Sequence, residues 1–448
     1  MQLTTASHDL ILFRRVIYQH TLGQRKDSLF ELTDAILTSA GPATLARLSL
    51  APGFRRRWSS VSDALTDGRV DVPLLRRLLV AALPVVPGGA RPLWAIDAST
   101  WPRPAATTSR ARTYAHRVAV GTPQSGVVGG WEYQWVVAVP EAQGSWVLPL
   151  DATRRRPTAG TATALASTQL SAVLADRSPT AARPVVTLDS GYDPIALTRA
   201  RLAADLLVRV AAHRVFFRPP PPPTRRGRPR RHGAPFRCKD AATWGTPARQ
   251  AAIDDPDYGR VVVAVWGGLH VKTATDTPLT VVRVQVERLP RRRRPPAPLW
   301  LVWIGGQLPA DLHQLWRWYP RRFAAEHGFR FAKHDLGWTT VRPCAPETAD
   351  RWTWLVAVAF WELWLARPLV VDQRLPWDRP LPPDRLTPGR VRRACAALLA
   401  HLGTPARPPH PRGKAPGRQP GQGRGPRTRF PLVRRHPHTA RRQRKRAA

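Results

Sequence analysis

A glutamate surrounded by cations is the group in this sequence best suited to do chemistry. Glu326 lies between Tyr319 and Lys333, and Arg322 precedes it by four residues. A helix turns by about 100° per residue, so these four side chains fall on one narrow stripe, which Arg330 joins. The stripe predicts a phosphate-binding surface with one metal-capable carboxylate. The same spacing also fits ordinary ion pairs on a solvated helix.

Two aspartates follow short apolar runs that are typical of buried strands. Asp97 comes directly after residues 92–96, and Asp189 comes directly after residues 184–188. If the two strands are parallel neighbours, their carboxylates meet at one edge of the sheet, where a helix could add Glu326. Aspartates at strand ends often cap the next turn instead. Asp151 and Asp193 occupy similar positions and show how easily a ligand could be misassigned.

Three such carboxylates could support two-metal phosphoryl transfer. The chemistry needs acidic side chains that hold two Mg²⁺ ions about 4 Å apart, one for the attacking oxygen and one for the leaving oxygen. Mg²⁺ prefers hard oxygen ligands and keeps part of its water shell, which suits a sparse set of Asp97, Asp189 and Glu326.

The spacing Y-x2-R-x3-E-x6-K, met at Tyr319, Arg322, Glu326 and Lys333, resembles the signature of DDE transposases of bacterial insertion sequences. The resemblance implies an α/β fold with an RNase H-like catalytic core, cleavage at transposon ends, and joining to target DNA without a covalent protein–DNA intermediate. It implies two Mg²⁺ ions, with Mn²⁺ able to substitute, held by Asp97, Asp189 and Glu326. Tyr319, Arg322 and Lys333 would contact phosphates near the transposon end.

Some members of that family carry a β insertion before the glutamate and cut through a hairpin intermediate, with an insertion Trp stacked on a flipped base. The 136 residues between Asp189 and Glu326 leave room for such an insertion, and residues 261–266, 279–286 and 299–304 have strand patterns. Trp266 is the candidate for stacking, although its apolar neighbours favour a place in the core.

The composition points to a nucleic-acid partner. The 448 residues carry 70 Lys and Arg against 30 Asp and Glu, a formal net charge of +40. We expect double-stranded DNA as the partner, both terminal repeats and target, and a homodimer in the DNA complex because two ends must be handled. Three scattered cysteines fit a reducing interior. The sequence shows neither a signal peptide nor a membrane-spanning run, so we expect a cytoplasmic, nucleoid-associated protein.

The chain divides by composition into three parts. Residues 1–90 have helical periodicity, and Gly68 between two apolar segments fits either a DNA-binding helix-turn-helix or an ordinary helical hairpin with a basic face at residues 55–57. Residues 91–403 would form the catalytic domain, with the insertion at about 215–305. Residues 404–448 contain no Asp or Glu and many Arg, Pro and Gly, which predicts a disordered basic tail.

Two alternatives remain open. A basic loop at residues 218–233 contains Gly227-Arg228-Pro229, which resembles the core of a minor-groove AT-hook but equally fits a solvated loop that touches phosphates. The whole chain could also be a non-catalytic DNA-binding protein derived from a transposase, or a structure-selective nuclease on the same fold. The acidic triad discriminates between the first of these and a transposase, because a purely binding protein has no use for carboxylates in a basic groove.

Overall fold

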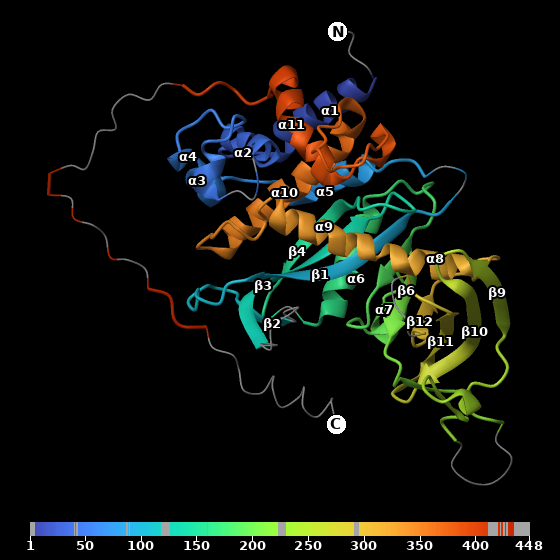
Figure 1. Cartoon of the computed structure of the whole chain (residues 1–448). Helices are drawn as coiled ribbons and strands as arrows, with labels where there is room; N and C mark the ends of the chain where they lie inside the picture. Colours follow the sequence, from blue (N-terminus) through green and yellow to red (C-terminus); the bar gives the residue numbers. More distant parts are fainter. Residues whose placement is uncertain are drawn as a thin grey trace.

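The computed structural model is a mixed α/β protein in which helices flank one large sheet (Figure 1). It describes residues 5–433 except for 40, 42–43, 87, 89, 118–125, 159, 223–229, 291–294, 411–419, 422, 424–425 and 427–428. The helices are α1 (Thr5–Val16), the π-helix η1 (Ile17–Thr21), α2 (Lys26–Thr38), α3 (Leu45–Leu48), α4 (Ser59–Asp67), α5 (Val72–Ala81), α6 (Ala162–Ala175), α7 (Pro194–Arg199), α8 (His313–Arg321), α9 (Phe323–His334), α10 (Pro346–Ala366) and α11 (Pro388–Leu402).

The described strands belong to one sheet that runs through the whole molecule. They are β1 (Leu93–Pro102), β2 (Thr113–Arg117), β3 (Gly126–Ala138), β4 (Leu148–Arg155), β5 (Val185–Leu188), β6 (Asp205–Val210), β7 (Val215–Phe217), β8 (Pro235–Arg237), β9 (Arg249–Asp255), β10 (Gly259–Val271), β11 (Ala274–Val286) and β12 (Leu299–Ile304). The main order is β2-β3-β1-β5-β6-β12-β11-β10-β7-β8, with β4 paired to β3 and β9 paired to β10.

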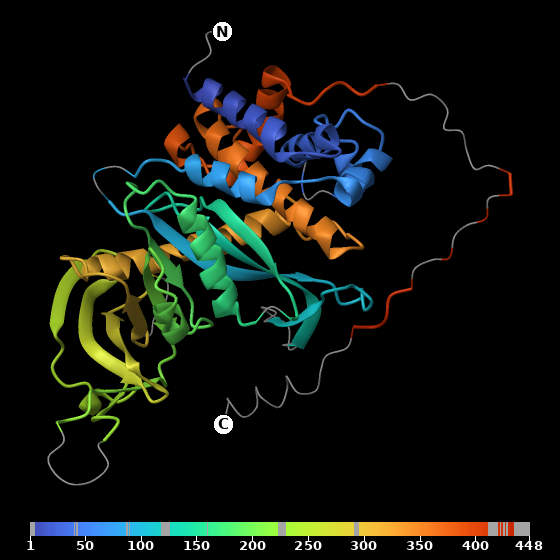
Figure 2. The same ribbon diagram turned by 180° about the vertical axis from the view of Figure 1, so that it is seen from behind.

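The part of the sheet that positions the aspartates combines antiparallel and parallel pairing. β3 pairs antiparallel with β1 and β4, whereas β5 lies parallel to both β1 and β6. Helix α9 crosses one face in Figure 1, and α6 covers the opposite face in Figure 2. Because both faces are covered, all four residues of β5 are buried, which explains why its sequence is continuously apolar.

The β insertion extends this sheet rather than standing apart from it. Strand β12 pairs antiparallel with β6 over Trp300–Ile304, and β11, β10, β7 and β8 follow in order. A second apolar core forms inside the insertion around Trp266, Trp300 and Phe236. The strands predicted at residues 261–266, 279–286 and 299–304 are therefore confirmed, and each belongs to β10, β11 or β12.

The N-terminal helices pack against helices from the other end of the chain. Helices α1 and α2 contact α10, and α2 also contacts α11, so residues on both sides of residue 90 share one hydrophobic core. Inside it, the Arg14 guanidinium forms ion pairs with Asp34 and Glu362, all three side chains being buried. Although α10 is apolar, no described helix is both long and apolar enough to span a membrane.

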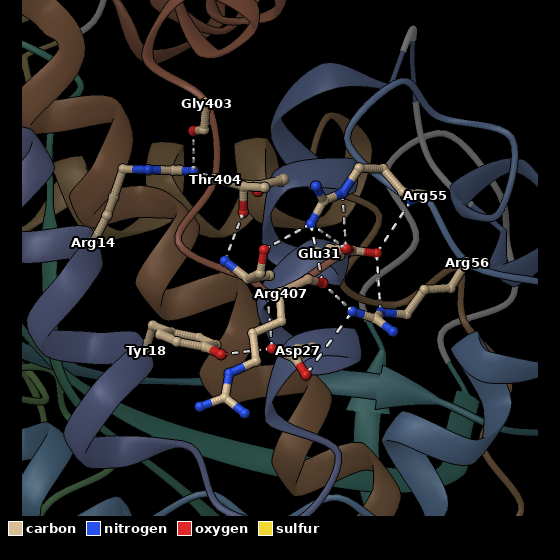
Figure 3. Close-up of polar contacts among 11 residues, drawn as sticks. Arg14, Tyr18, Asp27, Glu31, Arg55, Arg56, Gly403, Thr404 and Arg407 are labelled. Carbon is tan, nitrogen blue, oxygen red and sulfur yellow. Dashed lines mark hydrogen bonds and ion pairs between the residues drawn. The ribbon is translucent and has the colours of Figure 1, made fainter. Parts of the chain in front are cut away.

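The basic run at residues 55–57 is partly used inside the protein. Figure 3 shows Arg55 and Arg56 directed at Glu31 of α2, with closest nitrogen–oxygen distances of 2.8 and 3.3 Å. Helices α4 and α5 flank Gly68 as the sequence predicts, but α4 packs on α2 and α10, whereas α5 packs on η1, β4 and α6. DNA binding by a helix-turn-helix here stays a prediction.

The described part of the predicted basic tail makes defined contacts. The Arg407 amide donates to Asp27 at 3.0 Å, and Arg55 donates to the Ala406 carbonyl at 2.8 Å (Figure 3). Further along, the Val433 amide donates to the Thr107 carbonyl at 3.0 Å. The expectation of a fully disordered tail is thus wrong for these residues, because backbone groups at both places are hydrogen-bonded to the folded core. The AT-hook-like Gly227-Arg228-Pro229 lies outside the described residues.

Candidate active site

The two aspartates lie side by side on neighbouring parallel strands. The register of β1 and β5 pairs Ile96 with Leu188. Asp97 directly follows Ile96, and Asp189 directly follows Leu188. Asp189 follows the last residue of β5, as the sequence predicts. The pairing of two parallel strands thereby brings both carboxylates to one place in the sheet.

The prediction that Asp97 ends its strand is wrong. Asp97 is the fifth residue of β1, which continues to Pro102 because antiparallel pairing with β3 runs on to the Pro102–Gly130 pair. Only the parallel pairing with β5 stops at Ile96. At Asp97, β1 is therefore still paired with β3 but no longer with β5. The edge of β1 that faces Asp189 is free of pairing with any described strand from this residue on.

Local backbone bonds fix both aspartates. The Asp97 carboxylate accepts a hydrogen bond from the Ala98 amide, and that of Asp189 accepts one from the Gly191 amide, each at 2.8 Å. Asp193 has a different role, since its carboxylate accepts from the Ile195 amide at 3.0 Å and caps α7. Asp151 is buried within β4 and accepts from Gln169 and Thr153. These two aspartates are structural.

The glutamate run forms two helices instead of one. Helix α8 contains Tyr319 and ends at Arg321, Arg322 is the junction, and α9 begins at Phe323. The junction is closed by tight i→i+3 bonds, from the Arg322 amide to the Tyr319 carbonyl (3.1 Å) and from the Ala325 amide to the Arg322 carbonyl (2.9 Å). The predicted continuous stripe is therefore interrupted between Tyr319 and Glu326.

The junction turns Arg322 into the centre of the site. Its Nη1 lies 2.5 Å from an Asp97 carboxylate oxygen, and its Nη2 lies 3.2 Å from a Glu326 carboxylate oxygen. The side chain of Arg322 is 7% exposed, that of Asp97 17% and that of Glu326 53%. The predicted i,i+4 ion pair of Arg322 with Glu326 is confirmed. In the described structure no ion pair joins Glu326 to Arg330.

The electrostatics of Asp97 show that the acidic groups act on one another. Burial raises the pKa of Asp97 to about 6, against the lowering effect of the Arg322 guanidinium, and the negative charges of Asp189 and Glu326 raise it further. The charges of Asp189 and Glu326 therefore act on Asp97, and the role of the three carboxylates as a triad stays a prediction. Arg322 stabilises the ionised form of Asp97 but does not fully offset its burial.

The remaining predicted DNA contacts differ in exposure. Tyr319 is buried, 3% exposed, and burial raises the pKa of its hydroxyl. Arg330 is exposed on α9, and Lys333 is half-buried with its ammonium 5.9 Å from the Trp338 ring centre. Ala324, Ala325 and Phe331 point into the core, as the helical pattern predicts. Arg330 and Lys333 thus present positive charge next to Glu326.

Sequence reasoning missed a buried tyrosine behind the aspartates. Tyr192 is 6% exposed and hydrogen-bonds the side-chain amide of Gln134 at 3.2 Å. Burial raises the pKa of Tyr192, and the nearby carboxylates of Asp97 and Asp189 raise it further. Gln134 faces Ala98 across the β1–β3 pair. An aromatic residue just after a strand-end aspartate and a glycine was the available signal.

Trp266 does not have the position expected of a base-stacking residue. It is 4% exposed and packs at 5.2 Å from the Phe236 ring and at 6.1 Å from the Trp300 ring. Its indole nitrogen donates to the Gly245 carbonyl at 3.3 Å. The interpretation as a core residue of the insertion is therefore the one that the structure supports.

The donor chemistry of the site suits Mg²⁺, but its carboxylates are not gathered closely enough to bind one ion together. Asp97, Asp189 and Glu326 offer hard carboxylate oxygens, the ligand type that Mg²⁺ selects. Among the described residues, however, no group of three His, Cys, Asp or Glu side chains is close enough to bind one ion. The Arg322 guanidinium lies between two of the three carboxylates.

Comparison with known proteins defines the class. The family model described as DDE superfamily endonuclease matches residues 18–262, which is more than half of the 448 residues. The chain belongs to this superfamily of endonucleases. The matched segment includes Asp97 and Asp189 and ends before Glu326, so the third carboxylate rests on the geometry described above.

One solved structure is similar over much of the length. It is entitled a cryo-EM structure of the piggyBac transposase synaptic complex with hairpin DNA, and it shares 10% sequence identity with this chain at a TM-score of 0.41. The match covers 88% of this chain and 78% of the other. No curated protein sequence matches the chain.

Proposed function

We propose that this DDE superfamily endonuclease is a DNA transposase of the bacterial insertion-sequence type, which cleaves transposon ends and joins them to target DNA. The observation that carries the proposal is the convergence of Asp97 and Asp189 from paired parallel strands with Glu326 from α9, linked through Arg322. The mixed sheet, in which antiparallel β4-β3-β1 continues into parallel β5 and β6, supports an RNase H-like catalytic core.

In this proposal Asp97, Asp189 and Glu326 hold two Mg²⁺ ions. The ions would supply activation of the attacking oxygen and stabilisation of the leaving oxygen. The chain's own residues position the DNA: Arg330 and Lys333 offer cations beside Glu326, and phosphate oxygens are the partners that such cations bind. The Ala98 and Gly191 amides keep the aspartates in place. Because two transposon ends must be cut and joined, the active complex would be a homodimer on DNA.

The decisive experiment is Mg²⁺-dependent cleavage of a DNA fragment that carries the element's own ends. Asp97→Asn, Asp189→Asn and Glu326→Gln should each lower the cleavage rate by about 1000-fold or more, because the substitutions remove charge from the reacting centre. All three should still bind DNA, since the cationic residues are unchanged. Repeating the assay with Mn²⁺ tests whether it replaces Mg²⁺.

Asp193→Asn is the matched control. Asp193 is four residues from Asp189, and asparagine caps a helix as well as aspartate does, so α7 and cleavage should both persist. Wild-type activity in any one of the three triad variants would remove that residue from the site. A wild-type chain that binds the ends tightly but cuts them with neither Mg²⁺ nor Mn²⁺ would favour the non-catalytic DNA-binding protein.

A further inference from the structure

Arg322 occupies the position of a cation between two carboxylates of the proposed triad. One guanidinium nitrogen is 2.5 Å from Asp97 and another is 3.2 Å from Glu326. A buried carboxylate is costly unless a positive charge faces it. In the DNA-free chain that positive charge comes from Arg322, because no other Lys, Arg or His forms an ion pair with Asp97 or Glu326 in the described structure.

The pairing of Arg322 is incomplete, which makes it exchangeable. The side chain is only 7% exposed, and its buried Nε atom has no hydrogen-bond partner among the described residues. The neighbouring Arg321 is a contrast, because its guanidinium donates to the carbonyls of Glu141 and Val139 at 3.1 and 3.0 Å and touches no carboxylate. Only Arg322 of these two adjacent arginines competes for the acidic site.

We propose that Arg322 is a competing internal cation that lowers the metal affinity of the DNA-free protein and leaves the carboxylates when DNA phosphate arrives. The inference rests on the proposed function and adds its regulation. A guanidinium binds phosphate as readily as carboxylate, so the DNA backbone offers Arg322 another partner. Departure of Arg322 frees oxygens of both Asp97 and Glu326 for a metal ion, and the enzyme acquires its metals on DNA.

Such an exchange couples the two ligands reciprocally. If DNA raises the metal affinity by some factor, the metal raises the DNA affinity by the same factor. Couplings of this kind are typically about 5- to 150-fold. Removing the guanidinium should therefore strengthen metal binding without DNA and abolish the further gain that DNA brings.

The test measures Mn²⁺ binding to the full-length chain by the EPR signal of free Mn²⁺, with and without a duplex of the transposon end. Arg322→Met, which keeps an apolar stem of similar length, should bind Mn²⁺ about tenfold or more tightly than wild type without DNA. Wild type should gain a similar factor when the duplex is added, whereas Arg322→Met should gain little. Arg321→Met is the matched control and should behave like wild type.

Two outcomes separate the two proposals. Equal or weaker Mn²⁺ binding by Arg322→Met than by wild type, in protein that melts cooperatively, overturns the competing-cation inference while leaving the metal site intact. Binding that Glu326→Gln does not weaken in any background places the ion elsewhere and contradicts the proposed function as well. If Arg322→Met does not fold, Arg322→Gln, which keeps a hydrogen-bonding amide but no charge, provides the same comparison.

Discussion

Some carboxylates of this basic protein form ion pairs with arginines, and others have no described ion-pair partner. Glu31 binds Arg55 and Arg56, and Asp205 binds Arg91 and Arg183, so part of the large positive charge is neutralised internally. Asp189 has no ion-pair partner within the described residues, and its only described hydrogen bond comes from a backbone amide. The absence of a facing cation among the described residues agrees with the proposed role of Asp189 as a metal ligand.

Glu362 gives a prediction about pH at the same scale. Burial raises the pKa of Glu362 to about 7, against the effect of Arg14, and burial also raises the pKa of Asp34. The folded chain therefore keeps a proton on Glu362 that the unfolded chain releases above about pH 4.5, so its contribution to stability falls as pH rises from 4.5 towards 7.

Glu362→Gln removes this titration. Relative to wild type, the variant should gain about 2 kcal/mol in the free energy of unfolding between pH 5 and pH 8. Urea unfolding of both proteins at the two pH values measures the difference. A difference that stays constant with pH would mean that Glu362 ionises alike in the folded and unfolded chains.

At the scale of elements, helix α9 combines features that the sequence shows with one that it does not. The apolar spacing predicts which side of α9 is buried, and Ala324, Ala325 and Phe331 follow it. The break at Arg322 comes two residues after Pro320, which has no N–H to donate and favours a kink in a helix. The contact of Arg322 with the Asp97 carboxylate, 225 residues away in the chain, does not follow from periodicity.

The strands show the same division. Their apolar runs predict β5 and place Asp189 after it, but the length of β1 depends on β3, whose pairing carries β1 past Asp97. Sequence alone could therefore predict the strand before Asp189 and the buried side of the helix that carries Glu326. It could not show that Arg322 lies between two of them or that Tyr192 lies behind the aspartates, because both follow from contacts between distant segments.

Gly328 is explained by packing. A glycine weakens a helix by about 1 kcal/mol, yet a side-chain carbon at this position would come within 2.4 Å of the Val147 side chain. Gly328 thus permits α9 to approach the segment before β4 closely. Gly328→Ala should lower the free energy of unfolding by about 1–3 kcal/mol through overpacking, and should slow cleavage because α9 carries Glu326.

Thermal unfolding measures the loss of stability in Gly328→Ala, and cleavage of transposon-end DNA measures its loss of activity. The double variant Gly328→Ala, Val147→Ala is the control, since removing the Val147 methyl groups makes space for the new carbon. If the two costs were additive, the melting temperature of the double variant would fall by the sum of the two single-variant changes. We expect a smaller fall than this sum. Full additivity would show that Val147 is not what Gly328 accommodates.

At the scale of the whole molecule, residues 403–407 are hydrogen-bonded to the N-terminal helical region. Gly403, Ala406 and Arg407 accept hydrogen bonds from Arg14, Arg55 and Arg56, all of which lie in or beside the N-terminal helices (Figure 3). The Ala406 side chain is buried in the shared core. The three parts that composition predicts, with boundaries at residues 90 and 404, all contribute residues to one hydrophobic core. Their assignment to separate functions stays a prediction.

Truncation tests this fastening. A chain ending at Gly403 leaves Arg55, Arg56 and Asp27 without their C-terminal partners. It should lose about 2–4 kcal/mol of stability, the sum of several broken hydrogen bonds. A chain ending at His410 keeps those partners and should unfold close to the full-length midpoint. Urea unfolding distinguishes the two, and equal midpoints for both truncations would show that residues 404–407 contribute nothing.

The pairing of β12 with β6 has a mechanical consequence. The insertion is joined to the core by a ladder of backbone hydrogen bonds along Trp300–Ile304, and β6 is itself paired with β5, the strand that Asp189 follows. A pull exerted by DNA on the insertion would load this ladder as a whole, since all of its bonds must shear together. The insertion is thus stiffly coupled to the strand that precedes Asp189, and a force on the insertion would reach that residue as strain rather than be absorbed by a hinge.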